Sequence, residues 1–205
     1  MGFYREQVVP RLIDKMCGAA AMRQWRTEVT AGLTGRVVEI GFGSGLNVDL
    51  YPPAVECVMA VEPATVARRL SEARVRRSAV PVEHIGLDGQ AIALDDHSCD
   101  SALCTFTLCT IPDVDRALSE LRRVLRPGAR FHFLEHGLSP DPAVAVWQRR
   151  LEPLQRRLAD GCHLTRDPVV LIEAAGFTVE HIDQRYARGP KPWSWFSVGT
   201  AVTPG

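Results

Sequence analysis

Short apolar runs alternate along this chain with longer segments whose apolar residues recur every three or four positions. Helical spacing is clearest over Asp113–Leu125, where the apolar side chains fall on one face. A second helical segment spans Ala64–Arg77. The runs short enough for buried strands are Arg36–Ile40, Cys57–Val61, Val82–Ile85, Ser101–Thr105 and Ala129–Glu135. This alternation predicts an α/β fold with a parallel sheet and helices on both faces.

The last third of the chain continues the alternation. Pro140–Leu158 predicts a helix, and a further helix from about Pro168 to Ala175 ends at Gly176. Strands are expected over Phe177–Ile182 and Ser194–Val202. No linker, repeat or low-complexity segment interrupts the 205 residues, so we expect residues 1–205 to form a single domain.

Composition narrows the class of protein. The 24 basic and 24 acidic residues balance, which argues against a sequence-independent grip on nucleic acid. No apolar run approaches the ~20 residues of a membrane span, and the polar start of the chain does not resemble a secretory signal. We therefore expect a cytoplasmic protein without a transmembrane segment, and we leave peripheral membrane contact open.

The six cysteines are scattered through apolar segments, and no two of them form a CxxC pair. This pattern favours buried, reduced thiols over disulfides. A zinc site formed by His132 and His136 with Cys162 and His163 is disfavoured, because these residues belong to a strand and a distant loop. We expect no metal site.

Candidate chemistry begins at Gly41-Phe42-Gly43-Ser44-Gly45, directly after the first strand. Leu46–Leu50, which follows the glycines, can start a helix. Glycines between a strand and a helix allow a tight turn and let a ligand lie against bare backbone. A dinucleotide fingerprint requires glycine or alanine at position 46, where this chain has Leu46. The loop therefore predicts a nucleotide-like ligand that is not obviously NAD.

Two acids extend the predicted site. Glu62 ends the second strand, where a carboxylate is placed to accept both hydroxyls of a ribose; the alternative is an acid that complements a helix N-terminus. Asp88 follows the third strand, where it can accept from an exocyclic amine or serve as a turn residue. Both lie at the carboxyl edge of the predicted sheet, where ligands of open α/β sheets bind.

Together these features resemble the class I S-adenosylmethionine-dependent methyltransferases over nearly the whole chain. Glu39-x-Gly41-x-Gly43-x-Gly45 resembles the first motif of that family, and Asp100–Thr105 its fourth-strand motif. Leu125–Ala129 resembles its LRPGG turn, with Ala129 in place of the second glycine. The resemblance implies a Rossmann-like, seven-stranded methyltransferase sheet whose last strand, here Ser194–Val202, is antiparallel.

The resemblance also implies the cofactor, S-adenosyl-L-methionine, and the product S-adenosyl-L-homocysteine. In the family's pattern Glu62 binds the ribose and Asp88 contacts the adenine. The positions that match cofactor-binding residues are Glu39, Gly41, Gly43, Gly45, Asn47, Glu62, Pro63, Asp88, Gly89, Cys104 and Thr105.

A narrower resemblance to the type-11 methyltransferases, and to the branch that contains the methyltransferase-like thiol S-methyltransferases of animals, lies downstream. It rests on Phe133–His136, the helix around Trp147, Asp160–Arg166, Thr107–Cys109 and Tyr51–Pro53. His163 stands where the animal members usually have Asn, and we expect no counterpart here of their membrane-binding N-terminal segment. The branch implies a small, partly apolar methyl acceptor, with a thiol as the leading expectation.

Methyl transfer is an in-line displacement that needs the acceptor and the methyl group held close together. His136 is our candidate for steering or deprotonating the acceptor, because it leaves the fifth strand at the carboxyl edge of the sheet. The candidate acceptor contacts are Tyr4, Leu108, Trp147 and His163. We also expect residues 1–24 to form an N-terminal lid helix and residues 137–168 to form an insertion on the acceptor side.

Three alternatives remain open at this point. The first is O-, N- or C-methylation of a lipid head group, a quinone precursor or another small metabolite. The second is a non-catalytic module that binds S-adenosylmethionine. The third is an NAD-dependent oxidoreductase, which the glycine spacing disfavours.

Overall fold

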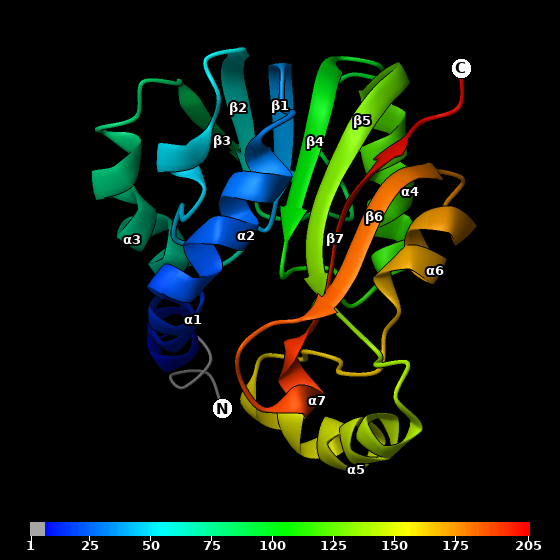
Figure 1. Ribbon diagram of the computed structural model, residues 1–205. Helices are drawn as coiled ribbons and strands as arrows, with labels where there is room; N and C mark the ends of the chain where they lie inside the picture. Colours follow the sequence, from blue (N-terminus) through cyan, green and yellow to red (C-terminus); the bar gives the residue numbers. More distant parts are fainter. Residues whose placement is uncertain (1–6) are drawn as a thin grey trace.

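The computed structural model describes residues 7–205 and has a seven-stranded sheet at its centre, in the order β3-β2-β1-β4-β5-β7-β6 (Figure 1). Strand β7 runs antiparallel to both of its neighbours, and the remaining pairs are parallel. The predicted fold class, including the antiparallel last strand, is confirmed. The strands are β1 (Gly35–Ile40), β2 (Val55–Val61), β3 (Val82–Gly86), β4 (Cys99–Thr105), β5 (Leu125–His136), β6 (Thr178–Tyr186) and β7 (Trp195–Val202).

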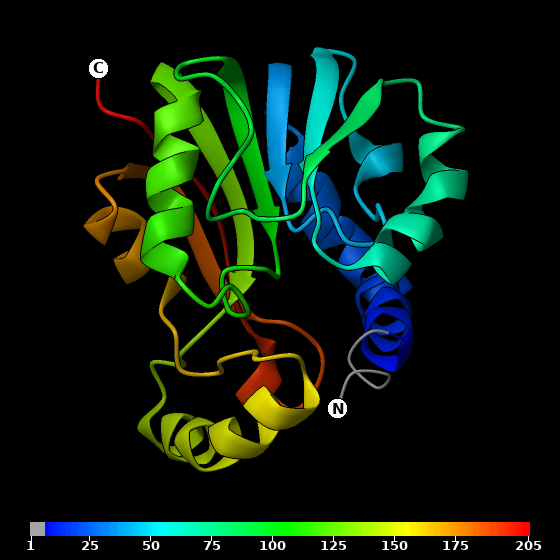
Figure 2. The same ribbon diagram turned by 180° about the vertical axis from the view of Figure 1, so that it is seen from behind.

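Helices cover both faces of the sheet. Helix α2 lies on one face, and α4 and α6 lie on the other, as the two opposite views show (Figures 1 and 2). Helices α1 and α5 lie beyond the end of the sheet to which β4 and β5 point (Figure 1). The helices are α1 (Val9–Cys17), α2 (Ala20–Thr30), α3 (Thr65–Val75), α4 (Val114–Val124), α5 (Pro142–Leu158), α6 (Pro168–Ala174) and α7 (Lys191–Ser194), with a 3₁₀ helix η2 (Val48–Leu50). Among residues 7–205, no helix combines the length and apolarity that crossing a membrane requires.

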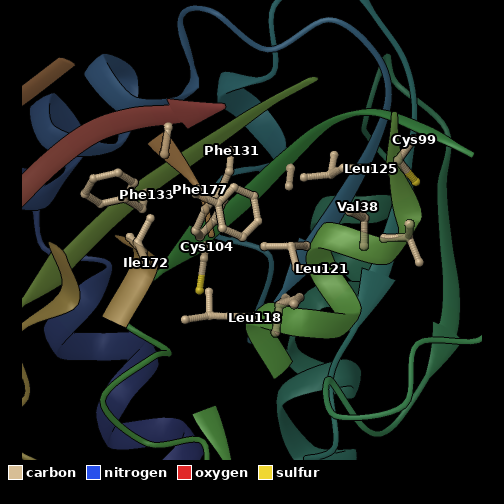
Figure 3. Close-up of a cluster of buried hydrophobic side chains, with 14 of the residues drawn as sticks. Val38, Cys99, Cys104, Leu118, Leu121, Leu125, Phe131, Phe133, Ile172 and Phe177 are labelled. Atoms are coloured by element: carbon tan, nitrogen blue, oxygen red, sulfur yellow. The ribbon is translucent and has the colours of Figure 1, made fainter. Parts of the chain in front are cut away.

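Two apolar cores lie on the two faces of the sheet because neighbouring strand residues point in opposite directions. Val38, Cys104 and Phe133 belong to the core beneath α4 and α6 (Figure 3). The adjacent residues Val37, Leu103 and Leu134 belong to the core beneath α2. All six are fully buried. The near-continuous apolar runs of the sequence therefore reflect strands that are covered on both faces.

Two local predictions were wrong. After the glycine loop, Leu46–Leu50 does not start an α-helix; it forms only η2, because the chain becomes extended at Tyr51 before Pro52 and Pro53. The sequence also predicts that Pro127-Gly128 stops the helix of Asp113–Leu125 and turns the chain into the next strand, and the structure differs. Helix α4 ends at Val124, and β5 already begins at Leu125, which pairs with Cys99. The pair Pro127-Gly128 lies inside β5, where the register with β4 shifts and Gly128 has a φ of 74°.

Replacement of Leu121 on α4 tests the larger core. Its side chain is fully buried against the sheet, so Leu121→Ala should lower the free energy of unfolding by about 2–5 kcal/mol. Val170→Ala on α6 is the matched control, because Val170 is 59% exposed and its loss should change stability by less than about 0.5 kcal/mol. Urea unfolding followed by circular dichroism measures both. Equal effects of the two substitutions would contradict the assigned packing.

Candidate active site

A cavity of about 870 Å³ opens at the carboxyl ends of β1, β2 and β4. The glycine loop, the segments after β2, β3 and β4, helix α1 and residues 156–163 all contribute to its wall. This volume suits a ligand of nucleoside size together with a small second molecule. Of the predicted site residues, those that line it are Gly41, Gly43, Glu62, Pro63, Asp88, Gly89, Thr105 and His163.

The glycine loop needs glycine at each of its three positions. Gly41, Gly43 and Gly45 have φ values of 71°, 58° and 75°, in the left-handed region that other residues avoid. A Cβ on Gly41 would also lie 2.0 Å from Thr107 Oγ1 in the loop after β4. Gly41 and Gly43 line the cavity, whereas Gly45 is absent from the lining of the described structure and packs near Val48.

Glu62 is fixed by the backbone of the cavity wall. One carboxylate oxygen accepts from the Gly43 amide at 2.7 Å and the other from the Ala64 amide at 2.8 Å. Burial raises the pKa of Glu62, and the two amides oppose that rise. Each carboxylate oxygen has two acceptor sites, so each retains one for a ligand. The carboxylate is thus preorganised to receive a pair of hydroxyl groups.

Asp88 lies on the cavity wall just beyond β3. Its Oδ1 accepts from the backbone amide of Gln90 at 2.8 Å and from the Gln90 side chain at 3.0 Å. These hydrogen bonds hold the pKa of Asp88 below its usual range. Asp88 is therefore an acceptor-only group at neutral pH, which suits a ligand amine.

A buried polar network lies at the base of the cavity. The fully buried Glu39 accepts from Asn47 Nδ2 at 2.8 Å and from the Tyr51 hydroxyl at 2.5 Å. Arg26 donates to Asn47 Oδ1 at 2.8 Å and to Thr105 Oγ1 at 3.0 Å. Burial raises the pKa of Glu39 to about 7, although Tyr51, Asn47 and Arg26 all act to lower it. Glu39 and Asn47 are absent from the described lining, so they support the wall from behind.

Arg26 is a site residue that sequence analysis missed. It is only 6% exposed, yet it lines the cavity and brings a guanidinium to the end of β4. Nothing in the sequence around Arg26 indicated a site residue, because a lone arginine on an N-terminal helix normally faces solvent. The contact with Thr105 joins residues 79 positions apart, and the sequence does not encode that proximity in any local pattern.

Helix α1 forms one wall of the cavity through Val9, Ile13 and Cys17. It is fastened by Asp14, whose Oδ1 accepts from Ser44 Oγ at 2.5 Å and from Arg74 at 3.1 Å. The described part of residues 1–24 therefore covers the site, and its movement as a lid stays a prediction. Tyr4, a predicted acceptor contact, lies outside the described residues.

The loop after β4 is held from two sides. Fully buried Glu135 accepts from the amides of Thr107 at 2.8 Å and Leu108 at 3.2 Å. Arg166 donates to the carbonyl oxygens of Leu108 and Ile111 at 2.6 and 2.8 Å. The loop starts at Phe106, whose φ of 55° is unusual for a bulky residue. These contacts fix the part of the wall next to Gly41.

Three further predictions do not match the lining of the described structure. Cys104 is fully buried and donates to Glu135 Oε1 at 3.4 Å, and Leu108 is buried in the core beneath α4. Trp147 is 56% exposed and lies beneath the guanidinium of Arg150. Helix α5 instead buries the adjacent Gln148, which bonds to the carbonyl oxygens of Gly137 and Pro192, so position 147 faces outward.

The two predicted histidines differ in position. His163 lines the cavity, with its Nδ1 3.0 Å from Glu152 Oε1. His136 is absent from the lining formed by the described residues, and its Nε2 lies 3.2 Å from the Cys162 sulfur. The catalytic role of His136 stays a prediction, and the structure gives its imidazole a thiol as partner.

Comparison with known proteins identifies a family. The family described as "Methyltransferase domain" matches residues 38–133. Thiol S-methyltransferase TMT1B of Rattus norvegicus is 33% identical over 174 residues, covering 81% of this chain and 68% of that protein. The Homo sapiens protein of the same name is 34% identical over 179 residues, covering 83% and 70%. Both matches include the glycine-loop and β4 regions that build the cavity.

A solved structure confirms the fold. Phosphoethanolamine N-methyltransferase 2 of Haemonchus contortus, in complex with phosphomonomethylethanolamine and S-adenosylhomocysteine, superposes with a TM-score of 0.71. The sequence identity is 15%, and the match covers 99% of this chain and 60% of that one.

The buried carboxyl of Glu39 makes stability depend on pH. With its pKa raised from 4.5 to about 7, native Glu39 keeps a proton that the unfolded chain has already lost between these two values. The Glu39 contribution to the free energy of unfolding should therefore fall by about 3 kcal/mol as pH rises through this window. Glu39→Gln should remove that decrease. Chemical unfolding from pH 4 to pH 8, with the exposed-site variant Glu56→Gln as control, measures the difference; parallel profiles for Glu39→Gln and wild type would contradict it.

Proposed function

Because the chain belongs to the class I S-adenosylmethionine-dependent methyltransferases, we propose that its cavity binds S-adenosylmethionine and a small, partly apolar thiol as the methyl acceptor. The observation that carries the cofactor assignment is Glu62, whose carboxylate is held on the cavity wall by the Gly43 and Ala64 amides. That arrangement leaves an acceptor site on each oxygen for the two ribose hydroxyls.

The other parts of the cofactor follow from the lining. Asp88 accepts from the adenine amine, and Pro63 and Gly89 border the base. The methionine portion lies along the backbone at Gly41 and Gly43, because neither glycine carries a side chain. Its carboxylate pairs with Arg26, because η2 is too short to supply a helix dipole and Arg26 is the buried cation at that end of the cavity.

Chemically, the acceptor sulfur attacks the methyl carbon while the bond to the sulfonium breaks, leaving S-adenosylhomocysteine. The acceptor proton goes to solvent as the thiolate forms. A thiol with a pKa of about 8.5 is already a few per cent thiolate at neutral pH, so positioning is the main requirement. The thiol assignment draws on the TMT1B relatives and on an acceptor side bordered by Phe106, Ile111 and His163.

The cavity draws its walls from distant parts of the chain, since both α1 and the segment 156–163 contribute to its lining. We accordingly propose one catalytic domain, with residues 137–168 on the acceptor side. A cytoplasmic location belongs to the same proposal, because thiols stay reduced there.

Cofactor binding separates the proposed roles of Glu62 and Arg26. Glu62→Ala removes hydrogen bonds to both ribose hydroxyls and should weaken S-adenosylhomocysteine and adenosine alike by roughly 10- to 100-fold. Arg26→Met should weaken S-adenosylhomocysteine by a similar factor and leave adenosine nearly unchanged, since adenosine lacks the carboxylate. Calorimetry measures both ligands, with Glu56→Ala as the control for surface charge. Tight NAD binding without affinity for S-adenosylmethionine would refute the cofactor assignment.

Turnover identifies the acceptor. A panel of small thiols, phenols and amines, assayed by formation of S-adenosylhomocysteine, should show turnover with the thiols. His163→Ala should raise the KM for the thiol several-fold while leaving S-adenosylmethionine affinity unchanged, because its imidazole lies on the acceptor side. Turnover of phenols or amines without any thiol would instead establish O- or N-methylation.

A further inference from the structure

Three potential metal ligands converge behind the cavity wall. The Cys162 sulfur lies 3.2 Å from His136 Nε2 and 3.6 Å from the Cys109 sulfur, and all three atoms lie within 4.8 Å of one another. The cysteines are only 4% and 8% exposed. The three residues come from segments up to 53 positions apart, which explains why no ligand spacing is visible in the sequence.

Each ligand sits on a fixed part of the chain. His136 is the last residue of β5, between strands β4 and β7. Cys109 belongs to the turn that Glu135 and Arg166 hold. Cys162 is positioned by the next residue, because the His163 amide donates to the Cys109 carbonyl oxygen at 2.9 Å. The cluster therefore does not depend on one flexible loop.

The spacing fits a tetrahedral metal ion. Zn–S bonds of about 2.3 Å and Zn–N bonds of about 2.0 Å place two sulfurs about 3.8 Å apart, and a sulfur and a nitrogen about 3.5 Å apart. The observed separations of 3.6 and 3.2 Å need only a small adjustment. A central cation at these separations engages the imidazole nitrogen and both sulfurs at once.

We propose that Cys109, His136 and Cys162 form a zinc site with three protein ligands and a fourth position open to water or a small ligand. On binding, both thiol protons pass to solvent, and neutral His136 coordinates through Nε2 with its proton on Nδ1. The ion joins the turn after β4, the end of β5 and the 160–163 segment. It thereby fixes Thr110, Gly161 and His163, which line the acceptor side of the cavity.

Metal binding explains the cluster better than a redox disulfide does. A metal ion stabilises two neighbouring thiolates directly. A disulfide would also leave the imidazole of His136 without a ligand role.

Cobalt binding tests the site directly. The full chain is reduced, stripped with a chelator and titrated with Co²⁺ alone, and the thiolate-to-cobalt charge-transfer band is recorded. We expect one Co²⁺ per chain, displaced by one Zn²⁺. Cys109→Ser and Cys162→Ser should each weaken Zn²⁺ binding by more than the roughly 10- to 100-fold that loss of a supporting residue costs. Cys57→Ser, a half-buried cysteine on β2, is the matched control and should bind as wild type does.

Several outcomes overturn the proposal. The first is wild-type protein that shows no charge-transfer band with Co²⁺. The second is a loss of Zn²⁺ affinity in Cys57→Ser equal to that in Cys162→Ser. The third is a Cys109–Cys162 disulfide, found by mass spectrometry, in place of bound metal. The wild-type titration alone tests whether the site binds metal, even if a variant fails to fold. No step involves S-adenosylmethionine, so failure of the metal site leaves the proposed methyl transfer standing, and the reverse also holds.

Discussion

The buried network of Glu39, Asn47, Arg26 and Thr105 is the interaction on which the rest of the structure depends. It places two ionisable groups inside an otherwise apolar interior, and such groups are tolerated there only when their hydrogen bonds are satisfied. Satisfying them requires β1, β4, α2 and the turn that follows the glycine loop to meet at one point. The same meeting point forms the floor of the cavity.

From that floor the two walls follow. Gly41 must approach Thr107 closely, so the first loop and the loop after β4 share one surface. Asp14 fastens α1 to the glycine loop, and Arg166 fastens the second loop to the segment beyond α5. The end of the cavity at the glycine loop, where we propose the cofactor, is thus built from strand ends, whereas the end proposed for the acceptor is built from segments that the tertiary fold brings together. This division matches a family that shares one methyl donor and differs in its acceptors.

Sequence patterns predicted the strands and most helices because both faces of the sheet are covered, which forces apolar runs at every central strand. They also placed Glu62 and Asp88, since acids at strand ends share one edge of a parallel sheet. The patterns did not reveal Arg26 or the grouping of Cys109, His136 and Cys162, which depend on contacts between distant segments. They misplaced Trp147, because a helix whose polar Gln148 points inward does not follow the usual apolar face.

The sequence by itself determined the α/β class and, through the family resemblance, a seven-stranded sheet with an antiparallel last strand. It also placed glycines and acids at the strand ends that border the cavity. These features are local: a period of two or 3.6 residues, a glycine needed for positive φ, an acid at the end of a strand. Only the tertiary structure decided which predicted site residues line the cavity, which of the two predicted histidines is among them, and which cysteines lie together. Those outcomes depend on packing and on satisfying buried polar groups, and both are properties of the assembled fold.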